Sequence, residues 1–342
     1  MLARRLLRDE VQRERERYRR QVIRPQRRLQ NPFHLLDDEQ FYARFRFTRG
    51  GVRELARRFG PERVERQTNI PPEHLMLQVL RFLGSSSYYL HNSDGGGIGL
   101  ATSFDNIQCI LERIAHEADN YVCWPAEQKR DLLMRQGLDQ YGIPRVMGCI
   151  DCTHIKLTPP AADKEEFRDR GNNTSLNVQA VVDLNYRFLS FNASWPGRHS
   201  QVYELFDTGQ LAGVLLGDLG YGNGKRWLLT PFRQPRNAAE RRYNEALRRF
   251  RVKVEQAFGQ LKRRWGCLAG VLRVGSVRKA QLIIAACIVL HNLAKDWRMP
   301  DNFNDLPAPP PAEDAEEEDD DEADAVDGPR YRMQIVHDYF QN

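Results

Sequence analysis

The sequence predicts an α/β domain that follows a smaller all-helical region. Between residues 31 and 125, apolar residues recur at three-to-four spacing, which is typical of amphipathic helices. From Arg145 onward, short apolar runs separated by turn residues predict strands instead. A helical pattern of more than about twenty residues follows the last of these runs. A chain of 342 residues is long enough to build both parts around cores of their own.

The composition is that of a globular protein and disfavours a membrane protein. Hydrophobic residues make up 41% of the chain and aromatic residues 10%, while the mean hydropathy is −0.63. The longest apolar run, Gln281–Leu290, falls short of the roughly 20 residues that cross a bilayer. The arginine-rich start of the chain contains acidic residues and no sustained apolar stretch, so we expect no secretory signal.

The six cysteines are scattered through apolar segments, as is typical of reduced thiols in an intracellular protein. Cys149 and Cys152 have the spacing of half a zinc site. The sequence offers no matching second half, so it disfavours structural zinc.

The charge is strongly polarised along the chain. The formal net charge is +5, yet Glu313–Asp327 contains 11 acidic residues and no basic one, so the chain without them would carry +16. Residues 1–30 are dense in arginine and predict an exposed basic arm, which could contact DNA or stay solvated. A body with this excess of positive charge suits a polyanion such as nucleic acid; a well-solvated basic surface is the alternative.

Residues 31–125 predict a helix-turn-helix-like region. Helical patterns cover 37–60, 71–84 and 102–122. Glycine-rich turn residues precede the third pattern, in which we expect the helix to begin near Thr102–Asp105. A helical hairpin that only packs on the main domain explains the pattern equally well.

The strand-like part begins with a short run and a hairpin. A turn at Leu184–Tyr186 separates the two strands of the hairpin, and residues 201–213 predict a helix before the last strand. The strand-like runs cover 146–150, 175–183, 188–195 and 214–218.

The long helix is expected over 237–266, where Gly266 stops it. A second, buried helix is expected over 279–297. Residues 299–342 then predict a Pro-rich and acidic disordered tail, within which the last residues, 330–340, either dock or stay free. The apolar stripe of the long helix consists of Phe250, Val254, Phe258, Leu261 and Trp265.

Two acids come at the ends of strand-like runs, Asp151 after the first and Asp218 after the last. Side chains just beyond strand ends are exposed at an edge of the sheet where ligands collect. Magnesium prefers carboxylate oxygens and keeps several waters, so two or three carboxylates suffice to bind it. A turn or capping role is the alternative for each acid alone.

Glu255 is the third candidate, because it lies within the long helix beside the apolar stripe. Gly259, one turn onward, would let the helix approach the sheet closely. The alternative is an exposed glutamate paired with Arg251 one turn back. The elements follow the order of a ribonuclease H-like domain: a strand, an acid, a hairpin, a helix, a strand, an acid and a long helix that carries an acid.

A long ordered set of motifs is more specific than any of these acids alone, and by it the chain resembles the PIF/Harbinger transposase family of DDE superfamily endonucleases. The resemblance runs from about Asn31 to Trp297. The motifs that carry it are VMGCIDCTHIKL, RGNNTSLNVQAVVD, SWPG, VLLGDLGYGNGKRWLLTPF, RRYNEALRRFRVKVEQAFGQLKRRWGCL and LIIAACIVLHNL.

The resemblance implies a ribonuclease H-like DDE nuclease domain over 140–298, preceded by an N-terminal all-α helix-turn-helix-like region. It also implies a catalytic triad of Asp151, Asp218 and Glu255. These carboxylates would bind two divalent ions, Mg²⁺ or Mn²⁺, which neutralise them and clamp the scissile phosphate.

Basic and polar residues around this triad are candidate DNA contacts. Lys156, Lys262 and Arg263 are expected to contact phosphates rather than to act in catalysis. The implied helix-turn-helix region places a DNA-facing helix at Asp105–Ala118. Its candidate contacts are Asn106 and Gln108.

The chain departs from the family pattern after its WPG element. Family members continue with a segment containing HDS, whereas this chain is shortened there and lacks the acid, although His199 and Ser200 remain. If that acid supports substrate or metal positioning, activity is weakened or lost. Nearer the triad, His154 could orient a ligand or water, and a packed or capping role is an equal alternative.

These observations predict a metal-dependent nuclease or transposase that acts on duplex DNA. One alternative is a domesticated DNA-binding protein that has kept the fold for recruitment or regulation; another is a metal-dependent ribonuclease. The resemblance also suggests a Myb-like DNA-binding partner protein. We expect work in the nucleus, no membrane association, and an oligomer as an open possibility.

Overall fold

The computed structural model describes residues 31–61, 70–85, 99–158, 174–193, 201–222, 224–301 and 327–341. The chain divides into two compact units, Met1–Ala115 and His116–Asn342. The expected basic arm, residues 1–30, lies outside the described residues.

The described part of the first unit consists of helices without a strand. Its core comes from apolar side chains at helical spacing, and in α6 the residues Met76, Val79, Leu80 and Leu83 are fully buried. A DNA-binding role for this region stays a prediction. The helices are α3 (Pro32–Leu35), α4 (Asp38–Phe45), α5 (Arg49–Phe59), α6 (Pro72–Gly84) and α8 (Leu100–His116).

The helical pattern expected over 37–60 is two helices rather than one. Helix α4 ends at Arg46, whose φ of 64° is left-handed and cannot continue a helix. Helix α5 starts anew at Thr48, whose side chain caps it by accepting a hydrogen bond from the backbone N–H of Gly51 at 3.2 Å. The capping threonine inside the pattern is the signal that separates the two helices.

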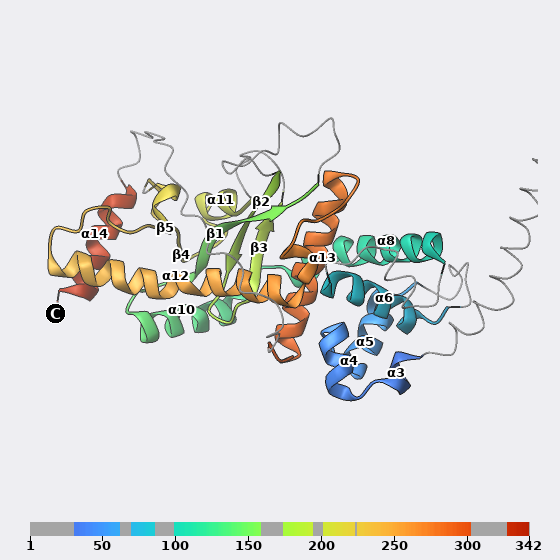
Figure 1. Cartoon of the computed structure of the whole chain (residues 1–342). Coiled ribbons are helices and arrows are strands. Elements are labelled where there is room, and N and C mark those ends of the chain that lie inside the picture. Colours follow the sequence, from blue (N-terminus) through green and yellow to red (C-terminus); the bar gives the residue numbers. More distant parts are fainter. Residues whose placement is uncertain are drawn as a thin grey trace, which may run out of the picture. The chain divides into compact units, whose positions relative to one another are not determined.

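The second unit is built on a mixed five-stranded sheet (Figure 1). The strand order is β3-β2-β1-β4-β5, with β1–β2 and β2–β3 antiparallel and β1–β4 and β4–β5 parallel. This mixed α/β arrangement is consistent with the predicted ribonuclease H-like fold. The strands are β1 (Val146–Lys156), β2 (Ser175–Val182), β3 (Phe188–Asn192), β4 (Val214–Leu216) and β5 (Leu228–Leu229).

Helices cover both faces of the sheet (Figure 1). On one face α12 lies against β1, β2 and β4, and α10 packs against both α12 and β1. On the other face Val202 and Phe206 of α11 join Ile150 and Val181 of the strands in one apolar cluster. The helices of this unit are α9 (Ala118–Tyr121), α10 (Glu127–Tyr141), α11 (Gln201–Asp207), α12 (Ala238–Arg264), α13 (Val277–Asp296) and α14 (Asp327–Phe340), with short 3₁₀ helices η4 (Leu219–Tyr221) and η5 (Gly266–Leu268).

The long helix α12 is the main support of the sheet, and its predicted stripe is confirmed. Asn237 caps its start by accepting from the backbone N–H of Glu240 at 2.8 Å, and Glu240 Oε2 accepts from the backbone N–H of Arg236 at 2.6 Å. Every residue of the stripe is buried: Phe250, Val254, Phe258, Leu261 and Trp265.

Helix α13 is the closing buried helix that the sequence predicts. Among the described residues it is the one helix long and apolar enough to cross a membrane by length and composition. Two thirds of its apolar window, 67%, is buried inside the fold, with Ile283, Ile288 and Leu290 at 1% exposure or less. It is therefore a core helix of the second unit.

The expected disordered tail, 299–342, is wrong for its last part. Asp327–Phe340 form α14, which packs on α12 and buries Ile335, Val336 and Phe340. The side chain of Arg242 on α12 donates from Nε to the carbonyl oxygen of Phe340 at 3.0 Å. The open alternative is thus settled in favour of docking, while 302–326 lie outside the described residues.

Candidate catalytic site

The sheet register brings Asp151 and Asp218 to the same edge. Strands β1 and β4 are parallel neighbours, and Cys149 pairs with Leu216 at the end of β4. Asp151 lies two residues beyond Cys149, and Asp218 lies two residues beyond Leu216. Because parallel strands run in step, both acids lie side by side just past the last β1–β4 pair. The predicted strand end before Asp151 is wrong, because β1 continues to Lys156 by pairing with β2, and Asp151 lies within it opposite Ala180.

The turn after β4 orients Asp218. Its side chain caps η4 by accepting from the backbone N–H of Gly220 at 3.1 Å, and the residue is half-buried. Gly217, just before it, allows the turn to close, because a Cβ there would lie 3.1 Å from the ring of Tyr221 and 3.2 Å from Leu228. The LLGD sequence thus places the acid at the start of a tight, packed turn.

Alternate residues of β1 face α12, and Asp151 is one of them. Cys149 Sγ lies 3.6 Å from the carbonyl oxygen of Phe250, and Arg251 Nη2 lies 3.4 Å from Asp151 Oδ2. Further along the strand, Lys262 Nζ donates to Thr153 Oγ1 at 2.8 Å. The helix therefore runs along this face from Phe250 to Lys262.

Glu255 lies one helical turn after Arg251, between these contacts, and is exposed. The sequence left open that Arg251 pairs with Glu255. In the structure Arg251 pairs with Asp151 instead, with side chains only 20% and 13% exposed. Glu255 is close enough for its charge to raise the pKa of Asp151.

The three predicted acids share one electrostatic environment. Burial raises the pKa of Asp151 most, and the charges of Asp218 and Glu255 raise it further. The backbone N–H of Cys152, which donates to Asp151 Oδ1 at 2.8 Å, and Arg251 both act to lower that pKa. Crowded carboxylates of this kind are relieved by positive charge.

The donor set suits a hard divalent cation in chemistry, since all three side chains offer carboxylate oxygens. As the side chains stand, no group of three His, Cys, Asp or Glu in the described part of the chain is close enough to hold a metal ion. One oxygen of Asp151 is occupied by a backbone N–H and the other faces Arg251. A cation bound at Asp151 Oδ2 would compete with Arg251 for that oxygen.

The predicted phosphate contacts lie along the end of β1. Lys262 donates to Thr153 and, at 3.1 Å, to the carbonyl oxygen of His154, so it ties α12 to β1. Burial, with a contribution from Lys156, lowers the pKa of Lys262 to about 8. Lys156 is exposed and Arg263 is half-buried. His154 is exposed, and its Nδ1 lies 2.9 Å from Ser175 Oγ of β2.

The opposite face of β1 carries a polar cluster that the sequence did not suggest. The hydroxyl of the half-buried Tyr221 lies 3.4 Å from Cys152 Sγ and accepts from Gln179 Nε2 at 3.3 Å. Burial raises the pKa of Tyr221 well above its usual range. Tyr221, three residues after Asp218, thus fastens the Asp218 turn to β1 and β2.

The same alternation explains the cysteine pair. Cys149 faces α12 and Cys152 faces Tyr221, on opposite sides of the strand. Both thiols are free, and burial raises the pKa of each. The CxxC spacing therefore does not form half of a zinc site.

The other DNA-contact candidates lie on α8 of the first unit. Gln108 Nε2 donates to Glu112 Oε1 at 2.6 Å, and Asn106 is half-buried. The Nδ2 atom of Asn106 is buried without a hydrogen-bond partner among the described residues. His199 and Ser200, after the WPG element, lie outside the described residues.

Comparison with known proteins shows which of them the chain is similar to. Residues 150–292 match the family model of the DDE superfamily endonucleases. The chain is 29% identical to "Putative nuclease HARBI1" of Mus musculus over 81% of its own length and 82% of that protein, and 28% identical to the protein of the same name in Homo sapiens over 80% and 82%. "Protein ALP1-like" of Arabidopsis thaliana is 28% identical over 64% of this chain and 59% of that protein. No solved structure matches significantly. The predicted resemblance is confirmed.

Proposed function

We propose that this protein is a metal-dependent nuclease of the Harbinger transposase type, which cuts or joins DNA with a triad of Asp151, Asp218 and Glu255. One observation carries the proposal: Asp151 within β1 and Asp218 just after the parallel neighbour β4 lie at the same level of the sheet, and α12 brings a third acid, Glu255, whose charge raises the pKa of Asp151. The nuclease names of the relatives support the reaction class.

Each acid has a distinct setting. Asp151 is largely buried and anchored by the N–H of Cys152, Asp218 is oriented by Gly220, and Glu255 is exposed on the helix. Magnesium or manganese ions held by these carboxylates would supply a water or DNA 3′ hydroxyl activated for in-line attack and a stabilised leaving oxygen. Arg251 supplies positive charge to Asp151 in their place.

Duplex DNA is the proposed substrate. Lys156, Lys262 and Arg263 would contact its phosphates beside the triad, and α8, with Asn106 and Gln108, would face the duplex. A Myb-like partner protein and work in the nucleus remain part of this proposal. A ribonuclease would share the site and differ only in substrate.

A second candidate function is DNA binding without cleavage. The specific observation in its favour is that Arg251 pairs with Asp151 and that no described group of three ligands stands ready for a metal. Metal-dependent cleavage separates the two candidates.

The test is cleavage of supercoiled plasmid, short duplexes and RNA with Mg²⁺ or Mn²⁺. Asp151→Asn, Asp218→Asn and Glu255→Gln are each expected to lose more activity than the roughly 10–100-fold typical of a residue that only supports a metal ligand. Glu245→Gln is the matched control, because Glu245 is an exposed acid of the same helix paired with Arg248.

The outcomes separate the candidates. Cleavage that all three variants lose and the control keeps supports the triad. Equal residual cleavage in all of them would indicate a contaminant, and duplex binding without cleavage, with a partner supplied, would favour the non-enzymatic function. Cleavage of RNA alone would favour the ribonuclease.

A further inference from the structure

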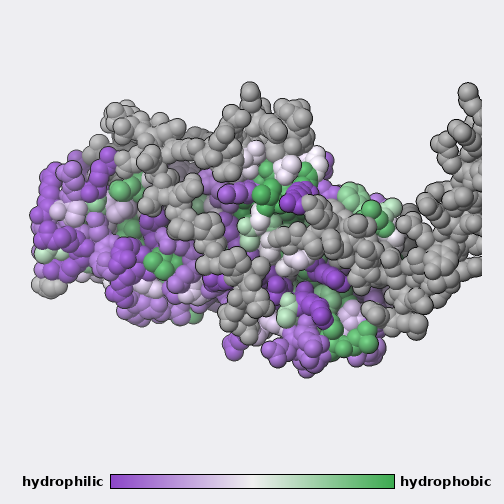
Figure 2. Space-filling model, viewed as in Figure 1, coloured by the Kyte–Doolittle hydropathy of each residue, from purple (hydrophilic) through white to green (hydrophobic). Residues whose placement is uncertain are grey.

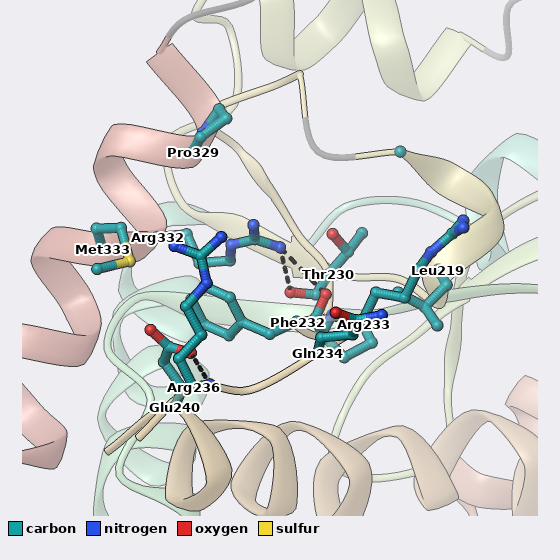
Figure 3. Close-up of a pocket in the computed structure, with 12 residues that line it drawn as sticks. Leu219, Thr230, Phe232, Arg233, Gln234, Arg236, Glu240, Pro329, Arg332 and Met333 are labelled. Atoms are coloured by element: carbon teal, nitrogen blue, oxygen red, sulfur yellow. Dashed lines mark hydrogen bonds between the residues drawn. The ribbon is translucent and has the colours of Figure 1, made fainter. Parts of the chain in front are cut away.

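A hollow of about 610 Å³ lies between α14, η4 and the segment that leads into α12 (Figure 3). Its size falls within the roughly 300–1,000 Å³ of small-molecule sites. Three arginines line it: Arg332 comes from α14, and Arg233 and Arg236 come from the segment before α12. Spacing alone does not predict this site, because α14 falls within the part of the chain that is expected to be a disordered tail.

One acid, Glu240, also lines the hollow, and both oxygens of its carboxylate accept hydrogen bonds. Glu240 is 5% exposed, and its Oε2 accepts from the backbone N–H of Arg236 at 2.6 Å. Its Oε1 accepts from Asn237 Nδ2 at 3.2 Å. The net charge of the lining is still positive, because three arginines stand against this one carboxylate.

Arg332 is held as a rigid donor. Its Nη1 donates to the carbonyl oxygens of Thr230 at 3.3 Å and Pro231 at 3.1 Å, and its guanidinium lies 4.1 Å from the ring centre of Phe232. Its Nε is buried without a hydrogen-bond partner among the described residues. A guanidinium fixed in this way adds a permanent positive charge to the wall of the hollow, which suits a phosphate group.

The hollow adjoins the candidate catalytic site. Leu219 and Gly222 form one of its walls, and Leu219 directly follows Asp218. Figure 3 shows Leu219 at the end of the hollow away from Met333 of α14. A strand whose reacting phosphate lies at Asp218 would therefore continue past Leu219 toward the arginines.

We propose that this arginine hollow binds backbone phosphates of the nucleic-acid strand next to the reacting phosphate, so that α14 is part of the substrate-binding surface. The proposal rests on the proposed function for its orientation to Asp218. The binding itself needs no metal, because guanidinium groups contact phosphates directly. The polyanion class follows from three arginines against one engaged acid.

The test measures duplex binding by the full-length chain with a chelator present, so that no cleavage takes place. The variant Arg233→Ala/Arg236→Ala removes two charges from the hollow and spares Arg332, whose loss would also release Thr230 and Pro231. Arg130→Ala/Arg135→Ala, on α10, removes equal charge from an element that does not line the hollow. Thermal melting of both variants confirms that they are folded.

The hollow variant is expected to bind about tenfold more weakly at 0.1 M salt, and the slope of log affinity against log salt is expected to fall by about 2. The α10 variant should keep both the wild-type affinity and the wild-type slope. Equal losses in the two variants, no loss in either, or a wild type that does not bind duplex DNA would overturn the proposal. A selective loss in a protein that cleaves nothing with Mg²⁺ or Mn²⁺ would support the hollow and refute the nuclease.

Discussion

Asp151 is the most constrained residue of the candidate site. Its two oxygens face different partners, the N–H of Cys152 and the guanidinium of Arg251, and it stands largely out of solvent. Removing one partner from a part-buried ion pair leaves an uncompensated charge, so Arg251 balances the charge of Asp151 and would compete with a cation for this oxygen. The helix that supplies Glu255 also supplies this competing charge.

His291 makes folding stability depend on pH. It is fully buried on α13, and its Nε2 lies 2.9 Å from the carbonyl oxygen of Tyr186. Burial, followed by the charge of Arg264, lowers its pKa from 6.5 to about 3. The unfolded chain therefore takes up a proton at a pH where the folded chain does not. The free energy of unfolding is expected to fall as the pH drops from about 6.5 toward 3.

Denaturant unfolding at pH 7 and pH 5 measures this effect. His291→Gln keeps a side-chain N–H donor without a titrating ring, so its stability should vary less between the two pH values than that of the wild type. If both proteins lose equal stability, other buried groups control the acid side of the profile.

Residue-level prediction from the sequence succeeds where neighbours are close along the chain. The strand runs before Asp151 and Asp218 are visible in the sequence, and so is the helical stripe beside Glu255. Helical spacing suggests Glu255, one turn away, as the partner of Arg251. The observed partner is Asp151, which is 100 residues distant in the sequence. That pair depends on how α12 lies across β1, which spacing alone does not reveal. The catalytic role of the three acids stays a prediction.

At the scale of elements, one asparagine joins α13 to the edge of the sheet. The Oδ1 of Asn292 accepts from the backbone N–H of Phe188 at 2.9 Å, and its Nδ2 donates to the carbonyl oxygens of Phe188 at 2.8 Å and Tyr121 at 2.9 Å. Asn292 is fully buried. The strand β3 and the end of α9 are thus fixed to the core helix by one side chain.

Asn292→Leu would remove the partner of the backbone N–H and the carbonyl oxygen of Phe188 inside the protein, whereas the carbonyl oxygen of Tyr121 keeps Arg187 Nη2 at 3.4 Å. Each buried unsatisfied group costs about 1–3 kcal/mol, so a loss of about 3 kcal/mol or more in the free energy of unfolding is expected by urea titration. Gln281→Met on the same helix is the control, because Gln281 makes a single part-buried bond to the carbonyl oxygen of Ala193 and should cost about 1 kcal/mol. Equal losses would contradict the bridging role of Asn292.

Two helices, α10 and α14, are not predicted from the sequence, and the physical reason differs between them. Helix α10 buries only Leu133 and Gly137, and a Cβ at Gly137 would lie 3.4 Å from the ring of Phe250, so close packing replaces an apolar stripe. Helix α14 follows an acidic, proline-rich segment whose composition predicts disorder. Its own apolar residues, Ile335, Val336 and Phe340, find a partner only once α12 is in place.

At the scale of the whole molecule, charge is divided between a basic body and an acidic segment. The side of the second unit formed by α12 and α14 is mostly hydrophilic (Figure 2). Helix α12 carries arginines and lysines along its length. Against this, Glu313–Asp327 holds 11 acidic residues. Both parts are tethered in one chain, so the acidic segment lowers the net charge that an approaching polyanion meets.

This division predicts that the acidic segment weakens duplex binding through its charge. Replacing Glu313–Asp324 with glycine and serine keeps the tether to α14 and removes its repulsion of phosphate, so binding at low salt should become tighter. The gain should shrink as salt rises, because the screening length falls from about 30 Å at 0.01 M to about 8 Å at 0.15 M. Fluorescence anisotropy across this range measures it, and a variant with the same residues in shuffled order is the control. The effect is due to charge if the shuffled variant binds like the wild type and the glycine–serine variant binds more tightly only at low salt. If the affinity of the glycine–serine variant at low salt is unchanged, the acidic segment does not oppose DNA binding.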